Sequence, residues 1–174
     1  QRSPILQRLG LIPGSYLLAT VHRAHNSDVA ENLHALLTAF MELGEPLIFP
    51  VHPRTRQKIS QLDSSFASKP LAANIRMIEP VGYLDMLLLE QNARLILSDS
   101  GGVQREAYFF GVPCITLLDE TPWPETVKAG WNVIVGTDLD AIKRAVHDHT
   151  WPEEAPEPIF GTGKAAQEIV RLLG

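Results

Sequence analysis

The chain lacks the marks of several protein classes. Its one cysteine, Cys114, lies in an apolar run, so no disulfide can form within the chain and a core position is predicted. No apolar run is long enough to span a membrane, and no signal peptide is recognisable. These absences predict a reducing, cytoplasmic setting. The chain starts at Gln1 without a Met, which suggests a fragment of a longer protein.

Other absences narrow the function. The net charge of −5 provides no basic surface for nucleic acid, although local basic residues can still meet a small anion. The six histidines and one cysteine follow no metal-binding spacing, so no metal site is predicted. Gly163-Lys164 precedes Ala165 and is no P-loop, and Ser100 lacks the flanking glycines of a hydrolase serine. With no evident carboxylate dyad, the chain is better suited to binding a nucleotide than to catalysis alone.

What the chain does have is a regular alternation of short apolar runs and helical patterns. Its 174 residues, 45% hydrophobic and 20% charged, suit one domain with a sizeable core. The runs expected to be strands cover residues 16–21, 47–51, 75–78, 95–97, 114–118 and 132–135. This alternation predicts an α/β fold with a doubly wound, Rossmann-like parallel sheet.

The expected helices lie between these runs. They cover residues 5–11, 29–43, a polar stretch ending near 62, 84–91, a stretch from Gly102 to Phe110, 125–129, 138–147 and 163–173. Residues 63–73 are expected to be a loop. Within one domain over 1–174, we predict a surface linker at 150–160, rich in Pro and Glu, and a terminal helix within 161–174.

Polar or glycine-rich loops follow five of the predicted strands. They are residues 22–28, 52–56, 79–83, 98–102 and 119–125. In doubly wound sheets, ligands bind at the carboxyl ends of the strands, near a topological switch point. The joint position of these loops therefore predicts one binding edge.

The stretch 93–111 is central to the prediction. A buried strand turns sharply into a helix at Ser100, Gly101 and Gly102, and no side chain is expected over the first helical N–H groups. Such a helix start is a seat for phosphate. Glu106 lies one turn into the helix, where a carboxylate can accept hydrogen bonds from ribose hydroxyls. The alternative is an ordinary tight turn between strand and helix.

Basic side chains on other loops complete the candidate site. His22 and Arg23 are candidates for contact with a pyrophosphate, and His22 can also act as an acid or base. For either residue alone, a solvated loop is the simpler interpretation. His52 is a further candidate, with a helix start at Pro53 as the alternative.

Several motifs together make the chain resemble the non-hydrolysing UDP-N-acetylglucosamine 2-epimerases, specifically their C-terminal domain. The matching stretches run nearly end to end and in the family's order: 20–24 (TVHRA), 50–55 (PVHPRT), 97–104 (LSDSGGVQ) with Glu106, 111–113 (GVP) and 161–166 (GTGKAA). The combination is much more specific than any one of these motifs.

This resemblance implies the C-terminal half of a two-domain GT-B fold, with the active site in the cleft and an N-terminal domain absent from this sequence. It implies interconversion of UDP-GlcNAc and UDP-ManNAc by elimination of UDP to a 2-acetamidoglucal and re-addition, without NAD, another cofactor or a metal. The enzyme would be a cytoplasmic homodimer serving cell-envelope polysaccharide biosynthesis. The carboxylates credited with proton transfer belong to the missing domain.

The resemblance also implies residue roles. Ser100, Gly101 and Gly102 would hold the phosphates and Glu106 the ribose. His22 would act near the diphosphate and the reacting sugar. Arg23 and His52 would contribute to substrate binding.

Three residues depart from the family pattern. His25 stands where Glu is usual, in a loop that in bacterial members helps to bind an activating second UDP-GlcNAc. Leu118 stands where Arg is usual, and Pro122 stands where Glu is usual. The alternatives are therefore an epimerase of another UDP-2-acetamido sugar, a GT-B glycosyltransferase domain, or a non-catalytic nucleotide-binding domain.

Overall fold

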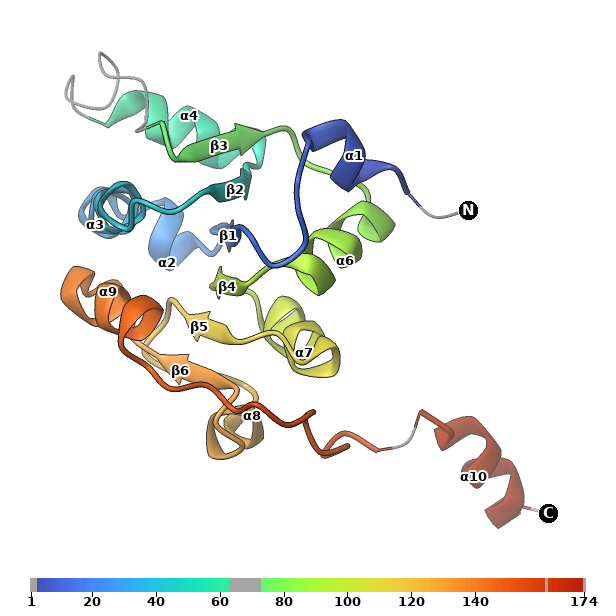
Figure 1. The fold of residues 1–174 in the computed structure, drawn as a ribbon. Coiled ribbons are helices and arrows are strands. Elements are labelled where there is room, and N and C mark those ends of the chain that lie inside the picture. The colour runs from blue at the N-terminus through green and yellow to red at the C-terminus, as the bar shows by residue number, and fades with distance from the viewer. Residues whose placement is uncertain (1–2, 63–72, 162, 174) are drawn as a thin grey trace.

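The computed structural model describes residues 3–62, 73–161 and 163–173, which form one α/β unit around a parallel sheet (Figure 1). Within these residues the sheet has six strands in the order β3-β2-β1-β4-β5-β6. The strands are β1 (Leu17–Thr20), β2 (Leu47–Pro50), β3 (Ile75–Ile78), β4 (Leu95–Ser98), β5 (Cys114–Thr116) and β6 (Asn132–Ile134). Every predicted strand is confirmed, as is the doubly wound parallel arrangement. The loop predicted at 63–73 lies outside the described residues, except for Ala73.

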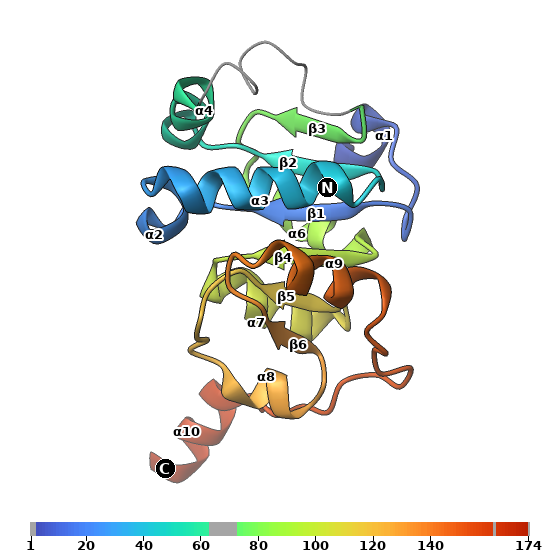
Figure 2. The ribbon, with the colours of Figure 1, turned by 90° about the vertical axis from the view of Figure 1, so that its left-hand side faces the viewer.

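Helices cover both faces of the sheet (Figures 1 and 2). Alternate strand residues point to opposite faces, so Leu17 and Ala19 join one core cluster and Leu18 the other. The first cluster lies under α3 (Ala30–Glu42), α4 (Pro53–Gln61) and α9 (Leu139–His147). The second lies under α1 (Ile5–Leu9), α6 (Tyr83–Asn92) and α7 (Gly101–Phe110). Each fully buried leucine of these clusters contributes roughly 1.5–3 kcal/mol to stability.

The ends of the helices follow local chemistry. Gly111 ends α7 in the left-handed conformation at φ 64°, as the sequence predicts. The first helix ends earlier than predicted, because Gly10, at φ 63°, stops it after Leu9. Asp138 caps α9 by accepting the Ala141 N–H at 2.6 Å. The terminal helix α10 (Ala165–Leu173) lies within its predicted range.

The polar loop predicted over residues 22–28 is partly wrong. Residues Ala24–Ser27 form a short helix, α2, in which Asn26 and Ser27 are buried. Sequence alone gave no sign of this helix, because its residues are polar and show no apolar periodicity. Contacts with residues far away in the sequence hold α2 in place.

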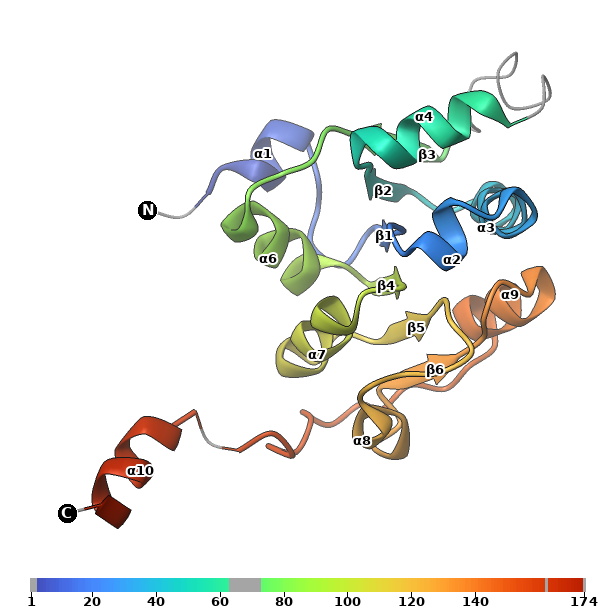
Figure 3. The same cartoon turned by 180° about the vertical axis from the view of Figure 1, so that it is seen from behind.

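The segment before α10 runs along the domain without regular structure but makes specific contacts. The Tyr108 hydroxyl donates to the Glu157 carbonyl oxygen at 2.7 Å, and the Phe160 ring packs edge-on against Tyr108 and Trp123. The short helix α8 (Pro124–Lys128) lies near this segment (Figure 3). Beyond it, α10 stands away from the sheet with its side chains exposed. Among the described residues, no helix combines the length and apolar character that a membrane crossing needs.

Candidate functional site

The site is built at the switch point between β1 and β4, the two central strands. Their registers pair Thr20 with Ser98, whose hydroxyl groups share a hydrogen bond of 2.6 Å. From there, the chain after β1 leads to the face covered by α3, and the chain after β4 leads to α7 on the opposite face. The two connections therefore diverge and leave a crevice at the carboxyl edge of the sheet.

Asp99, directly after β4, ties the loop after β1 into place. Its carboxylate is wholly buried and accepts the backbone N–H groups of His22, at 3.1 and 3.2 Å, and of Arg23, at 2.9 Å. The Asn26 amide donates to the same carboxylate at 3.2 Å and to the Leu117 carbonyl oxygen at 2.8 Å. One buried charge thus joins the ends of three strands, and it also holds the two residues that precede α2.

The His22 imidazole also contacts the Asp99 carboxylate. Its Nδ1 lies 3.4 Å from Asp99 Oδ1, and half of the histidine side chain is exposed. Because Nδ1 faces Asp99, the opposite ring nitrogen, Nε2, is turned away from it. A carboxylate at Nδ1 fixes the tautomer and orientation of an imidazole, which leaves Nε2 for exchange of a proton with a ligand. His22 is thus exposed to solvent, as the simpler interpretation of a solvated loop expects, but its ring is oriented by Asp99.

The first turn of α7 is open, but less so than the sequence predicts. Ser100 caps the helix, and its Oγ lies 3.5 Å from the Val103 nitrogen that donates to it. The prediction that no side chain covers the first N–H groups is thus wrong for Val103. The Trp123 indole donates to the Gly101 carbonyl oxygen at 2.6 Å. The N–H groups of Gly101 and Gly102 remain near the positive end of the helix dipole.

Gly101 and Gly102 differ in how closely other residues pack against them. A Cβ on Gly101 would stand 2.9 Å from Pro122 Cγ, so Gly101 is needed for close packing of the loop after β5. A Cβ on Gly102 would meet only Ser100 Oγ, at 3.7 Å, which is an ordinary contact. Neither glycine has a positive φ. Gly102 is therefore not required by the protein's own packing or backbone.

Glu106 lies one turn along α7 and faces α6. Its Oε1 accepts the Tyr83 hydroxyl at 2.9 Å, and this hydrogen bond and the charge of Glu106 raise the pKa of Tyr83. The Tyr83 side chain is otherwise exposed, at the start of α6. A carboxylate held in this way at the surface beside a phosphate seat can accept the two hydroxyls of a ribose.

His52 shares a hollow with His22. This hollow, of about 300 Å³, is lined by Thr20, Val21, His22, Pro50, His52, Pro80, Val81, Met86 and Val103. His52 also caps α4, since its Nδ1 accepts the Arg54 N–H at 3.2 Å and Pro53 is the first helical residue. The helix-start interpretation of His52 is therefore confirmed, and contact with a ligand is compatible with it.

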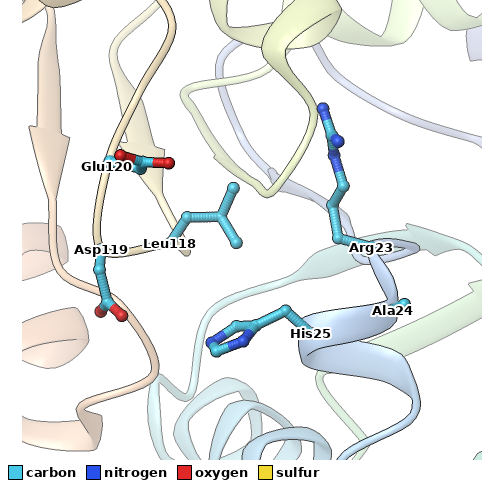
Figure 4. A pocket seen from close by; sticks show the side chains of 6 residues that line it. All are labelled: Arg23, Ala24, His25, Leu118, Asp119 and Glu120. Atoms are coloured by element: carbon cyan, nitrogen blue, oxygen red, sulfur yellow. The ribbon is translucent and has the colours of Figure 1, made fainter.

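A second hollow lies on the other side of the crevice. It measures about 530 Å³ and is lined by Arg23, Ala24, His25, Leu118, Asp119 and Glu120. Figure 4 shows residues of α2 on one side and residues of the loop after β5 on the other. Two departures from the family pattern, His25 and Leu118, face this hollow. Among the described residues, no group of three or more His, Cys, Asp or Glu side chains is arranged to hold a metal ion.

Most of the predicted site residues thus lie along one edge. His22, Arg23 and His52 follow β1 and β2, and the Ser100–Gly102 turn follows β4; Glu106 is set apart, on the α6 side of α7. Sequence reasoning quoted Asp99 within a motif but assigned it no role, and it missed Asn26 and Tyr83. The available signal for Asp99 was a carboxylate placed directly after a buried strand at the predicted switch point.

Replacing Asp99 by Ala is expected to destabilise the chain by about 2–4 kcal/mol, since the N–H groups of His22 and Arg23 lose their charged acceptor in a buried place. Urea unfolding followed by circular dichroism at pH 7 measures this. Asp148→Ala, which removes an exposed carboxylate, is the control and should change stability by less than about 0.5 kcal/mol. Equal stabilities of the two variants would contradict the role of Asp99.

Comparisons with known proteins extend over the whole chain. The family model for UDP-N-acetylglucosamine 2-epimerase matches residues 1–174. A UDP-N-acetylglucosamine 2-epimerase homolog of Methanococcus maripaludis is 46% identical over 169 residues, covering 97% of this chain and 47% of the relative. The UDP-2,3-diacetamido-2,3-dideoxy-D-glucuronate 2-epimerase of Pseudomonas aeruginosa is 39% identical over 162 residues, covering 91% and 44%.

Solved structures agree with the sequence relatives. The UDP-GlcNAc 2-epimerase of Methanocaldococcus jannaschii, in complex with UDP-GlcNAc and UDP, superposes with a TM-score of 0.81 at 38% identity, covering 99% of this chain and 49% of that one. The chain therefore spans about half the length of the relatives it matches, and its sheet corresponds to one half of the GT-B-like epimerase fold.

Proposed function

The chain belongs to the UDP-N-acetylglucosamine 2-epimerase family, and we propose that it is the UDP-binding half of an enzyme that inverts C2 of a UDP-2-acetamido sugar. The observation that carries this proposal is the crevice between β1 and β4. On one side of it stands the His22 imidazole, held by buried Asp99, and on the other the glycine start of α7, with Glu106 one turn further.

In this proposal the phosphates of UDP lie on the first turn of α7. The N–H groups of Gly101 and Gly102 and the helix dipole stabilise the negative charge, and Arg23 adds a positive charge from the opposite loop. The ribose hydroxyls donate to Glu106. His52 lines the hollow next to His22, where it can contact the ligand.

His22 is the one group of this half that we place at the reaction. As UDP leaves C1 and a proton leaves C2, charge builds up on the departing diphosphate. A histidine that stands at the phosphate seat and is oriented from Nδ1 can give a proton to that diphosphate and take it back on re-addition. The sugar product of the elimination step is a 2-acetamidoglucal with a double bond between C1 and C2, and re-addition of UDP at C1 with return of a proton to the opposite face of C2 interconverts UDP-GlcNAc and UDP-ManNAc.

Binding of UDP to the chain tests the proposal. Glu106→Ala is expected to weaken it by about 1.5–3 kcal/mol, or roughly 10- to 150-fold, because charge-assisted hydrogen bonds to the ribose are lost. Isothermal titration calorimetry at pH 7 measures the change. Glu31→Ala removes an exposed carboxylate of α3 and should bind UDP like the parent chain. Equal affinities of the Glu106 and Glu31 variants would refute the ribose assignment.

A second substrate can be tested by exchange of the C2 proton. The Pseudomonas aeruginosa relative is named for a UDP-2,3-diacetamido sugar acid, and Leu118 and Pro122 depart from the family pattern in the loop that faces the second hollow. The longer enzyme of which we propose this chain to be half can be offered UDP-GlcNAc and the diacetamido glucuronate separately. Faster exchange of the C2 proton in one of them identifies the sugar.

A further inference from the structure

One carboxyl group of this domain has no role in the site described so far. Glu90, on α6, is wholly buried, and no described donor reaches either of its carboxyl oxygens. Its surroundings are apolar: Leu89 beside it belongs to the core cluster, and the buried Cys114 thiol of β5 lies close enough for the charge of Glu90 to raise the pKa of that thiol. An ionised carboxylate without donors is strongly disfavoured in such a place.

The polar neighbour of Glu90 is another carboxyl group, that of Glu106. The helices α6 and α7 pack side by side (Figures 1 and 3), and Glu90 of α6 and Glu106 of α7 lie close enough for the charge of Glu106 to raise the pKa of Glu90. Two ionised carboxylates cannot form a hydrogen bond, because both are acceptors. If one keeps its proton, it can donate to the other. Burial decides which one: Glu90 is enclosed, whereas Glu106 reaches the surface beside Tyr83.

We propose that Glu90 is a positioning residue for nucleotide binding: it stays protonated and donates a hydrogen bond to Glu106, which is thereby held between Glu90 and the Tyr83 hydroxyl with its free lone pairs toward the ribose. This inference rests on the proposed function, because it takes Glu106 as the ribose acceptor. It adds that a buried carboxylic acid, Glu90, holds the Glu106 carboxylate in position.

The charges around the pair support this assignment. Burial, together with the charge of Glu106, raises the pKa of Glu90 to about 8. The group is therefore mostly neutral at pH 7. Tyr83, which meets Glu106 from the start of α6, has a raised pKa and stays protonated in the same range, and burial raises the pKa of Cys114. The positive charge of Arg105 opposes the rise in the pKa of Tyr83, and its guanidinium carbon lies 4.8 Å from the centre of the Trp123 ring.

The assignment makes UDP binding depend on pH. Bound diphosphate adds negative charge near the pair, so it raises the pKa of Glu90 further, and the complex holds the proton more tightly than the free chain does. Affinity must then fall as pH rises through the pKa of the free chain. If binding raises this pKa by about one unit, UDP binds roughly fivefold more weakly at pH 9 than at pH 7.

Calorimetric titration of the chain with UDP at pH 7, 8 and 9 tests this. Glu90→Gln keeps a neutral donor in the same place, so its affinity at pH 7 should lie within about twofold of the parent and should not show the fivefold loss at pH 9. Glu90→Leu removes the donor; we expect it to bind more weakly at pH 7, and also without that loss. Titration of UDP itself affects all three chains equally and cancels in the comparison. A parent chain with constant affinity, or a Gln variant with the parent's pH dependence, would overturn the inference.

A measurement on the parent chain keeps the test independent of how the variants fold. With the glutamate side chains labelled with ¹³C at the carboxyl carbon, one resonance should titrate near pH 8, well above the ordinary range of a glutamate. If all described glutamates titrate below pH 6, Glu90 is not protonated and the inference is wrong, whether or not UDP binds. If this resonance is found but UDP does not bind at pH 7, the proposed function fails and Glu90 remains a protonated core acid.

Discussion

Gly102→Val is expected to abolish UDP binding while the fold and its stability stay intact. A Cβ at this position has room in the free protein, since its one neighbour within 4 Å is Ser100 Oγ at 3.7 Å. The backbone of Gly102 is helical and accepts any residue, and Val is no worse than Gly inside a helix. In an α-helix, however, each Cα–Cβ bond tilts toward the N-terminus, so the two methyl groups would lean into the phosphate seat.

The expected loss is at least 100-fold in affinity, measured by calorimetry, with a melting temperature within a few degrees of the parent. Gly102→Ala should fall between the parent and the Val variant, because one methyl group blocks less of the seat. Gly101→Ala is the matched contrast: its Cβ would stand 2.9 Å from Pro122 Cγ, so it should lower the melting temperature as well as the affinity. Near-normal binding by Gly102→Val would place the phosphates elsewhere.

The fold was predictable because each strand can be recognised from its own residues and those next to it in the sequence. Runs such as Leu95–Ser98 are short, apolar and followed by turn residues, and helices with an apolar stripe separate them, so the alternating pattern alone implies a parallel sheet. The short helix α2 was not predictable in this way. Its residues are polar, and its start is fixed by Asp99, which is more than seventy positions away in the sequence.

The edge that carries the site was predictable from the polar loops that follow the strands, but contacts within the site were predictable only inside one motif. The glycine turn and Glu106 belong to one strand-turn-helix unit, so their spacing in the sequence predicts their relative positions in the structure. Contacts between units follow from the strand order, which sequence periodicity does not give. Asp99 reaches His22 because β4 lies beside β1, and Glu90 meets Glu106 because α6 and α7 cover the same face of the sheet.

The 174-residue chain by itself is expected to bind UDP but not to epimerise UDP-GlcNAc. The proposed phosphate and ribose contacts all come from this chain, so binding should persist, though more weakly, because half of the cleft is open to water. Epimerisation needs more. Removing and returning a weakly acidic C2 proton requires a base, an acid on the opposite face of the sugar, and exclusion of water.

Within the described residues, His22 is the acid–base group that we place at the departing diphosphate. Asp99 is buried and already accepts the N–H groups of His22 and Arg23, and Glu106 accepts the Tyr83 hydroxyl on the α6 side of α7. The His22 side chain is also half exposed to solvent. One group in contact with water cannot serve both faces of C2.

The test follows exchange at C2 by NMR while the purified chain is incubated with UDP-GlcNAc in deuterated water. Calorimetry on the same preparation shows that it binds UDP, and a full-length relative such as the Methanocaldococcus jannaschii UDP-GlcNAc 2-epimerase confirms that exchange is detectable under these conditions. The Gly102→Val chain, purified in parallel, reports any contaminating epimerase, since it should carry the same contaminants without a phosphate seat of its own. Exchange by the parent chain above that background would mean that the second proton-transfer group lies in this half, and that the division of binding and catalysis between the two halves proposed above is wrong.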